Sequence, residues 1–261
     1  MTGTLLNVLT IVIGGGLGVL LGGRLPVRLR QTVVAGLGLF VLVLGVQTFF
    51  QTHNSLVVLG SLLIGALLGE WLQVEEGIRN LGRWLESRFS GRKAKSVAVT
   101  GELNDTEVSA AAAAAFKQER FVRGFFTASL VFCVGPIAIL GSIEDGMTGN
   151  YQLLAVKAIL DGFAAMAFAS SLGVGVIFSA LPILIYQGAI SLAAVQIRPI
   201  ISDLMLSEMS ATGGVILVAI AISSLLEIKQ IRTGSFLPAL LVAPILVAIL
   251  TFLGINWASL P

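Results

Sequence analysis

Charged residues are scarce in this sequence. Of its 261 residues, only 11% are Asp, Glu, Lys or Arg, whereas 56% are hydrophobic. A soluble domain carries roughly 25% charged residues, so this chain has too little charge to cover a surface that faces water. Its apolar runs reach the roughly 20 residues that a helix needs to cross a bilayer, and they lack the alternation of barrel strands. The composition predicts an all-α, polytopic transmembrane helix bundle in contact with the lipid bilayer.

Cysteine and histidine are almost absent, which removes several classes of site. Cys133 is the only cysteine, so the chain can form no internal disulfide and no cysteine-based metal cage. His53 is the only histidine and lies in a short loop, which excludes a two-histidine zinc site and a serine–histidine pair deep in the bundle. We therefore expect no catalytic residue, no metal, no cofactor and no enzyme activity. The net charge of +2 is too small to indicate nucleic acid.

Eight apolar segments predict eight spans, at 4–22, 33–51, 55–72, 122–142, 153–172, 176–196, 211–226 and 236–255. No basic residue precedes the first of them, so we expect it to remain as a span rather than to be removed as a signal peptide. Seven spans are the alternative, because the 36 residues between Asp161 and Arg198 are uncharged and could form a broken or re-entrant element. The "GVG" at 173–175 is the favoured break. The chain then divides into three spans over 1–72, a connector over 73–120 and a five-span region over 121–261.

The basic residues predict the orientation. Every one of the 16 except Lys157 and Arg198 lies in loops that share one side of an eight-span bundle. Basic residues concentrate in cytoplasmic loops, so that side should be the cytoplasm and both termini should lie outside.

The connector contains one amphipathic segment. Val74, Ile78, Leu81, Leu85 and Phe89 recur at helical spacing, which predicts a cytoplasmic helix that lies in the membrane interface. The insert over 90–119 begins without periodicity and ends in strong helix formers that lead into span four. The connector is either a solvated link or a regulatory, partner-binding element.

Small residues recur four positions apart in two spans. Such faces let helix backbones approach closely, which is the main packing device in lipid, or they line a path. The same faces could join two copies of the chain into a homo-oligomer. The residues are Gly14, Gly18 and Gly22 in span one and Ser61, Gly65 and Gly69 in span three.

Lys157 and Asp161 are charged residues inside an apolar run. They are one helical turn apart, so they share a face and can pair, and Asp161 falls near the middle of the bilayer. Charges at that depth are costly and normally face a partner or a cavity. The pair is either a structural ion pair or part of a site that binds or relays a charged species.

Two polar residues follow a proline in span six. Tyr186 and Gln187 lie four and five residues after Pro182, and a proline disturbs the helix ladder behind it. Interrupted helices are where transporters expose backbone to substrate, so both residues are candidate ligands.

Three acidic residues near span ends complete the candidate site. Glu208 heads span seven, where it either binds substrate or stabilises the helix N-terminus. Glu144 and Asp145 lie where span four meets the outer surface, and they form either an ordinary turn or a cation-attracting vestibule above Lys157. By contrast, Glu70 and Glu227 lie at cytoplasmic span ends, where we expect them to pair with basic loop residues.

Five long runs occur in a distinctive order: "FCVGPIAILGSIEDG", "KAILDG", "FASSLGVGVIFSALPILIYQG", "EMSATGG" and "LLEIKQIR…LPALLVAP". In these runs the chain resembles the YqgA-like family of uncharacterised bacterial multi-pass inner-membrane proteins. The resemblance is close from span four onward and looser over spans one and two. It implies a bacterial cytoplasmic (inner) membrane location and, loosely, transport, but it supplies no site residues. The insert over 90–119 departs from the family, which implies that the core activity does not need it.

The leading hypothesis is a small-solute or ion transporter or channel with a polar site at mid-membrane. The alternative is a structural or regulatory membrane protein whose buried charges only fix helix packing.

The predicted orientation can be tested with topology reporters. A reporter fused after Pro261, or inserted into 144–150, should report the outer side because few basic residues lie there. A reporter within 91–105 should report the cytoplasm. A cytoplasmic C-terminus would contradict eight spans and point to a re-entrant element within 162–197.

Overall fold

The structure is a computed structural model that describes residues 1–24, 26–89, 105–133 and 136–254. The side chains of 105–114 are outside this description, as is the segment 90–104 of the expected insert. The described residues form only helices and the turns that join them, as the composition predicts. In chain order the helices are α1 (Thr2–Gly22), α2 (Val27–Phe49), α3 (Ser55–Trp71), α4 (Val74–Phe89), α5 (Asp105–Cys133), α6 (Pro136–Thr148), α7 (Gln152–Leu172), η1 (Val174–Ser179), α8 (Ala180–Leu192), α9 (Ala194–Ile197), α10 (Asp203–Ile220), η2 (Ala221–Leu225), η3 (Thr233–Phe236) and α11 (Ala239–Phe252).

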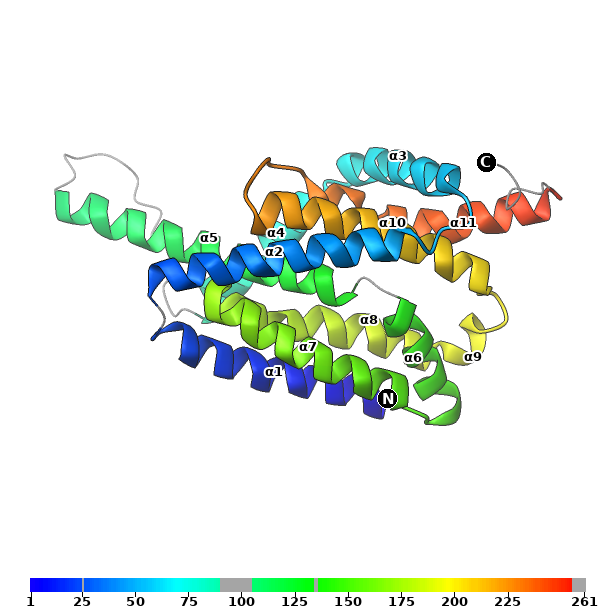
Figure 1. Cartoon of the computed structure of the whole chain (residues 1–261), viewed down its shortest axis with the longest axis horizontal. Helices are drawn as coiled ribbons and strands as arrows, with labels where there is room; N and C mark the ends of the chain where they lie inside the picture. Colours follow the sequence, from blue (N-terminus) through cyan, green and yellow to red (C-terminus); the bar gives the residue numbers. More distant parts are fainter. Residues whose placement is uncertain (25, 90–104, 134–135, 255–261) are drawn as a thin grey trace.

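The number of membrane-crossing segments agrees with the expected bundle. Six helical segments within the described residues are long and apolar enough to cross a bilayer, and the number rises to eight if each of two bent helix pairs counts as one span. One pair is α3 with α4, and the other is α5 with α6. Figure 1 shows that α1 begins and α11 ends at the same end of the bundle. A chain that crosses a membrane an even number of times begins and ends on the same side.

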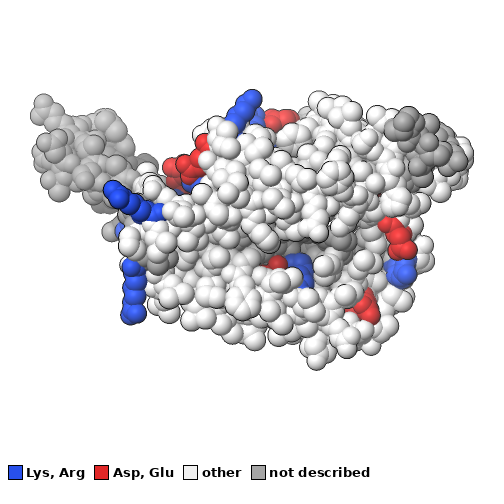
Figure 2. Space-filling model, viewed as in Figure 1, with Lys and Arg blue, Asp and Glu red and all other residues white. Residues whose placement is uncertain are grey.

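The helices form two groups (Figure 1). One group contains α1, α6, α7 and α8, and the other contains α2, α3, α10 and α11. Figure 2 shows that charged side chains gather mainly toward the two ends of the molecule, with a white band between them. In the middle of this band a blue and a red side chain lie together in a hollow. A bundle with this distribution presents an apolar belt to lipid.

Two expected span boundaries are wrong. The span expected at 122–142 is not continuous, because α5 and α6 are bent by 65° around residues 134–135. The span expected at 211–226 begins earlier, since the Ser202 side chain accepts a hydrogen bond from Met205 N and caps α10 there. Glu208 therefore lies inside α10 rather than at its start. The break expected at 173–175 is confirmed: α7 ends at Leu172, and Gly173 adopts φ +87°, which favours glycine.

The amphipathic segment of the connector is helical, as α4. Its apolar face is partly covered by the protein, because Leu85 is buried against Phe121 and Phe125 of α5. Trp84 remains exposed on the same helix. Helix α4 therefore packs on the bundle through one part of its surface only. Its place at the cytoplasmic interface stays a prediction.

The small-residue faces are used for packing within the chain. A Cβ atom added at Gly14, Gly18 or Gly22 would overlap a backbone carbonyl of α7. Added at Gly65 or Gly69, it would overlap the backbone of Ala239 or Ser235, respectively. These contacts confirm close helix packing. In this structure α7, η3 and α11 pack against the two faces, and a homo-oligomer through them stays a prediction.

The contact between α1 and α7 can be tested by a single methyl group. In Gly18→Ala the new Cβ would meet the carbonyl oxygen of Met166, so the helices must separate, and we expect a loss of about 1–3 kcal/mol of stability. Gly16→Ala is the matched control on the same helix, because its Cβ would have nothing within 4 Å. Thermal unfolding in detergent measures both, and equal stability of the two variants would contradict the packing.

Candidate functional site

Lys157 and Asp161 form an ion pair on α7, as their spacing predicts. At 1.5 Å per residue they lie about 8 Å and about 14 Å along the helix from Gln152. Only 9% of the Lys157 side chain and 12% of the Asp161 side chain are exposed. The pair is therefore held almost entirely within the protein, at a depth where lipid would surround an unpacked helix.

Lys157 has a second partner at the break between α5 and α6. Its Nζ atom donates a hydrogen bond to the carbonyl oxygen of Phe132, at 2.9 Å. In a continuous helix that oxygen would accept from the backbone N–H of residue 136, but Pro136 has none. The ammonium therefore satisfies a carbonyl that the proline leaves open. It also places positive charge at the C-terminus of α5, where the helix dipole favours it.

Two amide side chains from other helices complete this cluster. Asn7 of α1 donates from Nδ2 to Oε1 of Gln187 in α8, at 3.3 Å, and both residues are fully buried. The Asn7 side chain also lies close to Asp161. We call Asn7, Phe132, Lys157, Asp161 and Gln187 the midbundle cluster. It joins four helices, α1, α5, α7 and α8.

The cluster contains two predicted site residues beyond Lys157, namely Asp161 and Gln187, and two participants that sequence reasoning missed. Asn7 carried a weak signal, since it is an amide within an apolar run. For Phe132 the signal was the proline at position 136. A proline four residues later leaves the Phe132 carbonyl without a helical hydrogen-bond partner. Behind Pro182 the helix changes to the 3₁₀ form, as η1, but the span continues without a sharp bend, because Pro182 lies in the first turn of α8, where proline is tolerated. The sharper helix break is the 65° bend between α5 and α6.

The remaining predicted residues lie elsewhere. Tyr186 is half-buried and packs against an apolar cluster of Ile139, Ile143, Ala194 and Leu206. Glu144 accepts a hydrogen bond from Asn150 Nδ2, at 2.7 Å. Neither side chain contacts the ion pair of α7.

Asp145 lies at the N-terminus of α1. Its buried carboxylate accepts a hydrogen bond from Gly3 N, at 3.0 Å, and lies 3.1 Å from the Met1 amino group. The Asp145 carboxylate is therefore neutralised at the N-terminus of α1 and not by Lys157, which pairs with Asp161. The Asp145 side chain is fully enclosed in this structure and does not line an open vestibule.

Glu208 closes the N-terminus of a different helix, α3. It is fully buried, and its carboxylate accepts hydrogen bonds from Thr52 Oγ1, His53 N and Asn54 N, at 2.7, 2.6 and 3.1 Å. A carboxylate at backbone N–H groups is a charge-assisted cap. This geometry favours the stabilising role, although the helix that Glu208 stabilises is α3, not its own α10.

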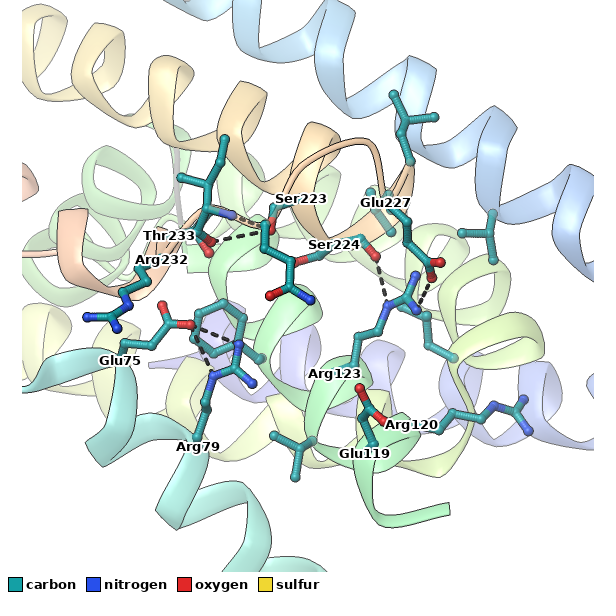
Figure 3. A pocket seen from close by; sticks show the side chains of 18 of the residues that line it. Glu75, Arg79, Glu119, Arg120, Arg123, Ser223, Ser224, Glu227, Arg232 and Thr233 are labelled. Atoms are coloured by element: carbon teal, nitrogen blue, oxygen red, sulfur yellow. Dashed lines mark hydrogen bonds and ion pairs between the residues drawn. The ribbon is translucent and has the colours of Figure 1, made fainter. Parts of the chain in front are cut away.

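A polar cavity of about 1530 Å³ opens at the opposite end of the bundle, near the basic loops. Figure 3 shows Arg79 paired with Glu75 and Arg123 paired with Glu227 on its wall. Glu227 thus pairs with a basic residue, as the sequence predicts. Glu70 likewise pairs with Arg232, at 2.9 Å.

Arginines of this cavity also close helix C-termini. Arg120 donates to the carbonyl oxygen of Ser171, at 2.8 Å, and Arg123 donates to that of Ser224, at 2.8 Å. These carbonyls belong to the last turn of α7 and to the π-helical segment η2. The cavity is thus lined by fixed charges, several of which hold helix ends in place.

An apolar layer separates the cavity from the midbundle cluster. Ser171 and Leu172 line the cavity, ten or more residues beyond Asp161, which is about 15 Å along α7. The intervening core includes Ala165 and the aromatic pair Phe132–Phe168, whose ring centroids are 6.1 Å apart. The cluster is therefore closed toward the cavity in this conformation.

Comparisons with known proteins agree on one family. Residues 2–248 match the family described as "Protein of unknown function (DUF554)". The chain is 31% identical over 241 residues to "Uncharacterized protein YqgA" of Escherichia coli, covering 92% of this chain and 94% of that protein. It is 26% identical over 261 residues to "Uncharacterized membrane protein YdfK" of Bacillus subtilis, covering 98% and 100%. No solved structure matches. The chain is thus a helical, multi-pass member of the DUF554 family of membrane proteins.

Proposed function

We propose that this protein is a small-solute or ion transporter of the bacterial cytoplasmic membrane, with its substrate site at the midbundle cluster. The observation that carries the proposal is an ion pair buried at mid-bundle beside a broken helix. Each charge at such a depth costs roughly 2.5–3.5 kcal/mol on insertion. Apolar residues of similar size often replace a buried ion pair without loss of stability. A pair that is retained despite this cost therefore favours a functional role.

The broken helix supports the same proposal. Transporters commonly expose the open ends of discontinuous helices near the bilayer midplane, where backbone carbonyls and helix dipoles contact the substrate. Here the carbonyl of Phe132 is open at the α5–α6 break, and its partner is a side chain rather than a backbone group. A side chain can leave such a carbonyl more readily than a helix can unwind.

The cavity provides an approach from one side. The basic residues around it favour a cytoplasmic position. The apolar layer around Phe132 and Phe168 closes the cluster from this cavity, and on the other side Leu154 is fully buried against α1 and α6. Both closures suit an occluded conformation of an alternating-access transporter. Movement about the α5–α6 break would open the path to the cavity.

A structural or regulatory role for the pair is the second candidate. The bond from Lys157 to Phe132 favours it, because closing a helix C-terminus is a sufficient reason to bury one ammonium. In that case the protein transports nothing through the cluster, and the ion pair only fixes α5 against α7.

A double substitution separates the two candidates. Lys157→Met/Asp161→Asn removes both charges together, so it should fold with near-normal thermal stability while uptake falls at least about tenfold. Purified protein in proteoliposomes would be tested with labelled Na⁺, Rb⁺, amino acids and carboxylates, and with a dye for proton flux. Ser170→Ala is the matched control, because this α7 hydroxyl bonds only within α7 and its neighbour Ser171.

The single substitutions provide the folding comparison. Lys157→Met or Asp161→Asn leaves one buried charge without its partner, which should cost about 3–5 kcal/mol of stability. Full uptake by the folded double variant would end the transport role of the pair and leave the structural one.

A further inference from the structure

We infer that the midbundle cluster binds a small, dehydrated monovalent cation, which takes the place of the Lys157 ammonium beside Asp161. This inference rests on the proposed function and names the class of its substrate or coupling ion. It is argued from the oxygen ligands of the cluster, their charge and the amide oxygen of Asn7, which has no hydrogen-bond partner among the described residues.

The donor atoms suit a hard cation. The cluster presents the Asp161 carboxylate, the Phe132 carbonyl and the side-chain carbonyl oxygens of Asn7 and Gln187. Oxygen ligands of this kind, and in particular the open carbonyl at a helix C-terminus, coordinate alkali and other hard cations in membrane proteins. The ligand atoms of the cluster are oxygens, and Cys133 at the end of α5 is the only cysteine of the chain. A soft metal ion is therefore not the expected ligand.

The net charge of the cluster favours a cation that carries one positive charge. Asp161 is its one carboxylate, so the cluster without Lys157 carries −1, which a monovalent cation neutralises. A divalent cation would leave an uncompensated positive charge in a site of low dielectric constant. The pair's small exposure, 9% and 12% of its two side chains, also leaves no room for a bulky solute in this conformation.

Lys157 occupies the position that the cation would take. Its Nζ atom bridges the Asp161 carboxylate and the Phe132 carbonyl, which are two of the proposed ligands. One carboxylate cannot neutralise both an ammonium and a second cation, so the cation binds as Lys157 releases a proton, and the neutral amine then leaves the carboxylate. This structure then represents the state without a bound ion, in which the Lys157 ammonium fills the site.

The amide oxygen of Asn7 supplies an independent observation. Asn7 Oδ1 has no hydrogen-bond partner among the described residues, although the side chain is fully buried. An unpaired buried polar atom is costly, and in native proteins it calls for a specific explanation such as an ion. Asn7 Oδ1 belongs to the same amide group that donates to Gln187 Oε1, one of the proposed ligands, so it lies at the edge of the proposed site. It is the additional oxygen ligand that a bound cation would use.

Binding of ²²Na⁺ to the purified full-length protein tests this inference, with choline chloride keeping the ionic strength constant. Lys157→Met removes the internal competitor and keeps the carboxylate, so its affinity for Na⁺ should exceed that of the wild type roughly tenfold or more. Na⁺, but not choline, should also raise its melting temperature. Asp161→Asn and the double variant should bind no Na⁺, and Ser170→Ala should bind as the wild type does. Li⁺ and K⁺ as competitors would define the size that the site accepts.

Lys157→Gln is the second variant if Lys157→Met is too unstable to purify, because its amide can still donate to the Phe132 carbonyl. Failure of both variants to show Na⁺-specific binding or stabilisation would overturn the inference, as would undiminished Na⁺ binding by Asp161→Asn. The transport proposal and the cation-site inference can be contradicted independently of each other. Uptake of an organic solute that depends on the pair, without cation binding, leaves transport standing and ends the cation site. Cation binding without any flux leaves the cation site standing and ends the transport proposal.

Discussion

Hydrocarbon offers no hydrogen-bond partner, so each open helix end in this bundle must find a partner within the chain. Most of the buried charges serve that need. Carboxylates of Asp145 and Glu208 accept hydrogen bonds at the N-termini of α1 and α3. Guanidinium groups of Arg120 and Arg123 donate to carbonyls at the C-terminal ends of α7 and η2. Each charge has the sign that the helix dipole favours at its position.

The midbundle cluster obeys the same constraint at an unusual depth. Pro136 breaks a helix in the middle of the bundle, which creates an open C-terminus far from water. Lys157 closes it, and Asp161 neutralises Lys157. The N–H group that Pro136 lacks therefore accounts for the buried Lys157, and Lys157 in turn requires the charge of Asp161 and the amides beside it. If any cation can replace the ammonium, the break becomes the place where ligand binding and helix movement are coupled.

Local sequence predicted the parts of the site that depend on spacing within one helix. Lys157 and Asp161 pair because residues four apart meet on a helix, and Gly173 ends α7 because its backbone angle suits glycine. The two prolines differ in tertiary context. Both fall in the first turn of a helix, Pro182 in α8 and Pro136 in α6, but η1 and α8 form one candidate span whereas α6 is bent by 65° from α5. The sequence does not show which proline accompanies a change of helix direction.

The sequence by itself determined the helical membrane class, because so little charge cannot coat a soluble surface and because a helix satisfies its own backbone in lipid. It also determined the close approach of α1 to other helices, since glycines at every fourth position leave room for a backbone. Only the tertiary structure decided that the partner of α1 is α7, and that Asn7 meets Gln187, 180 residues away. Such contacts depend on how whole helices pack, and the pattern within one helix does not specify which neighbour covers it.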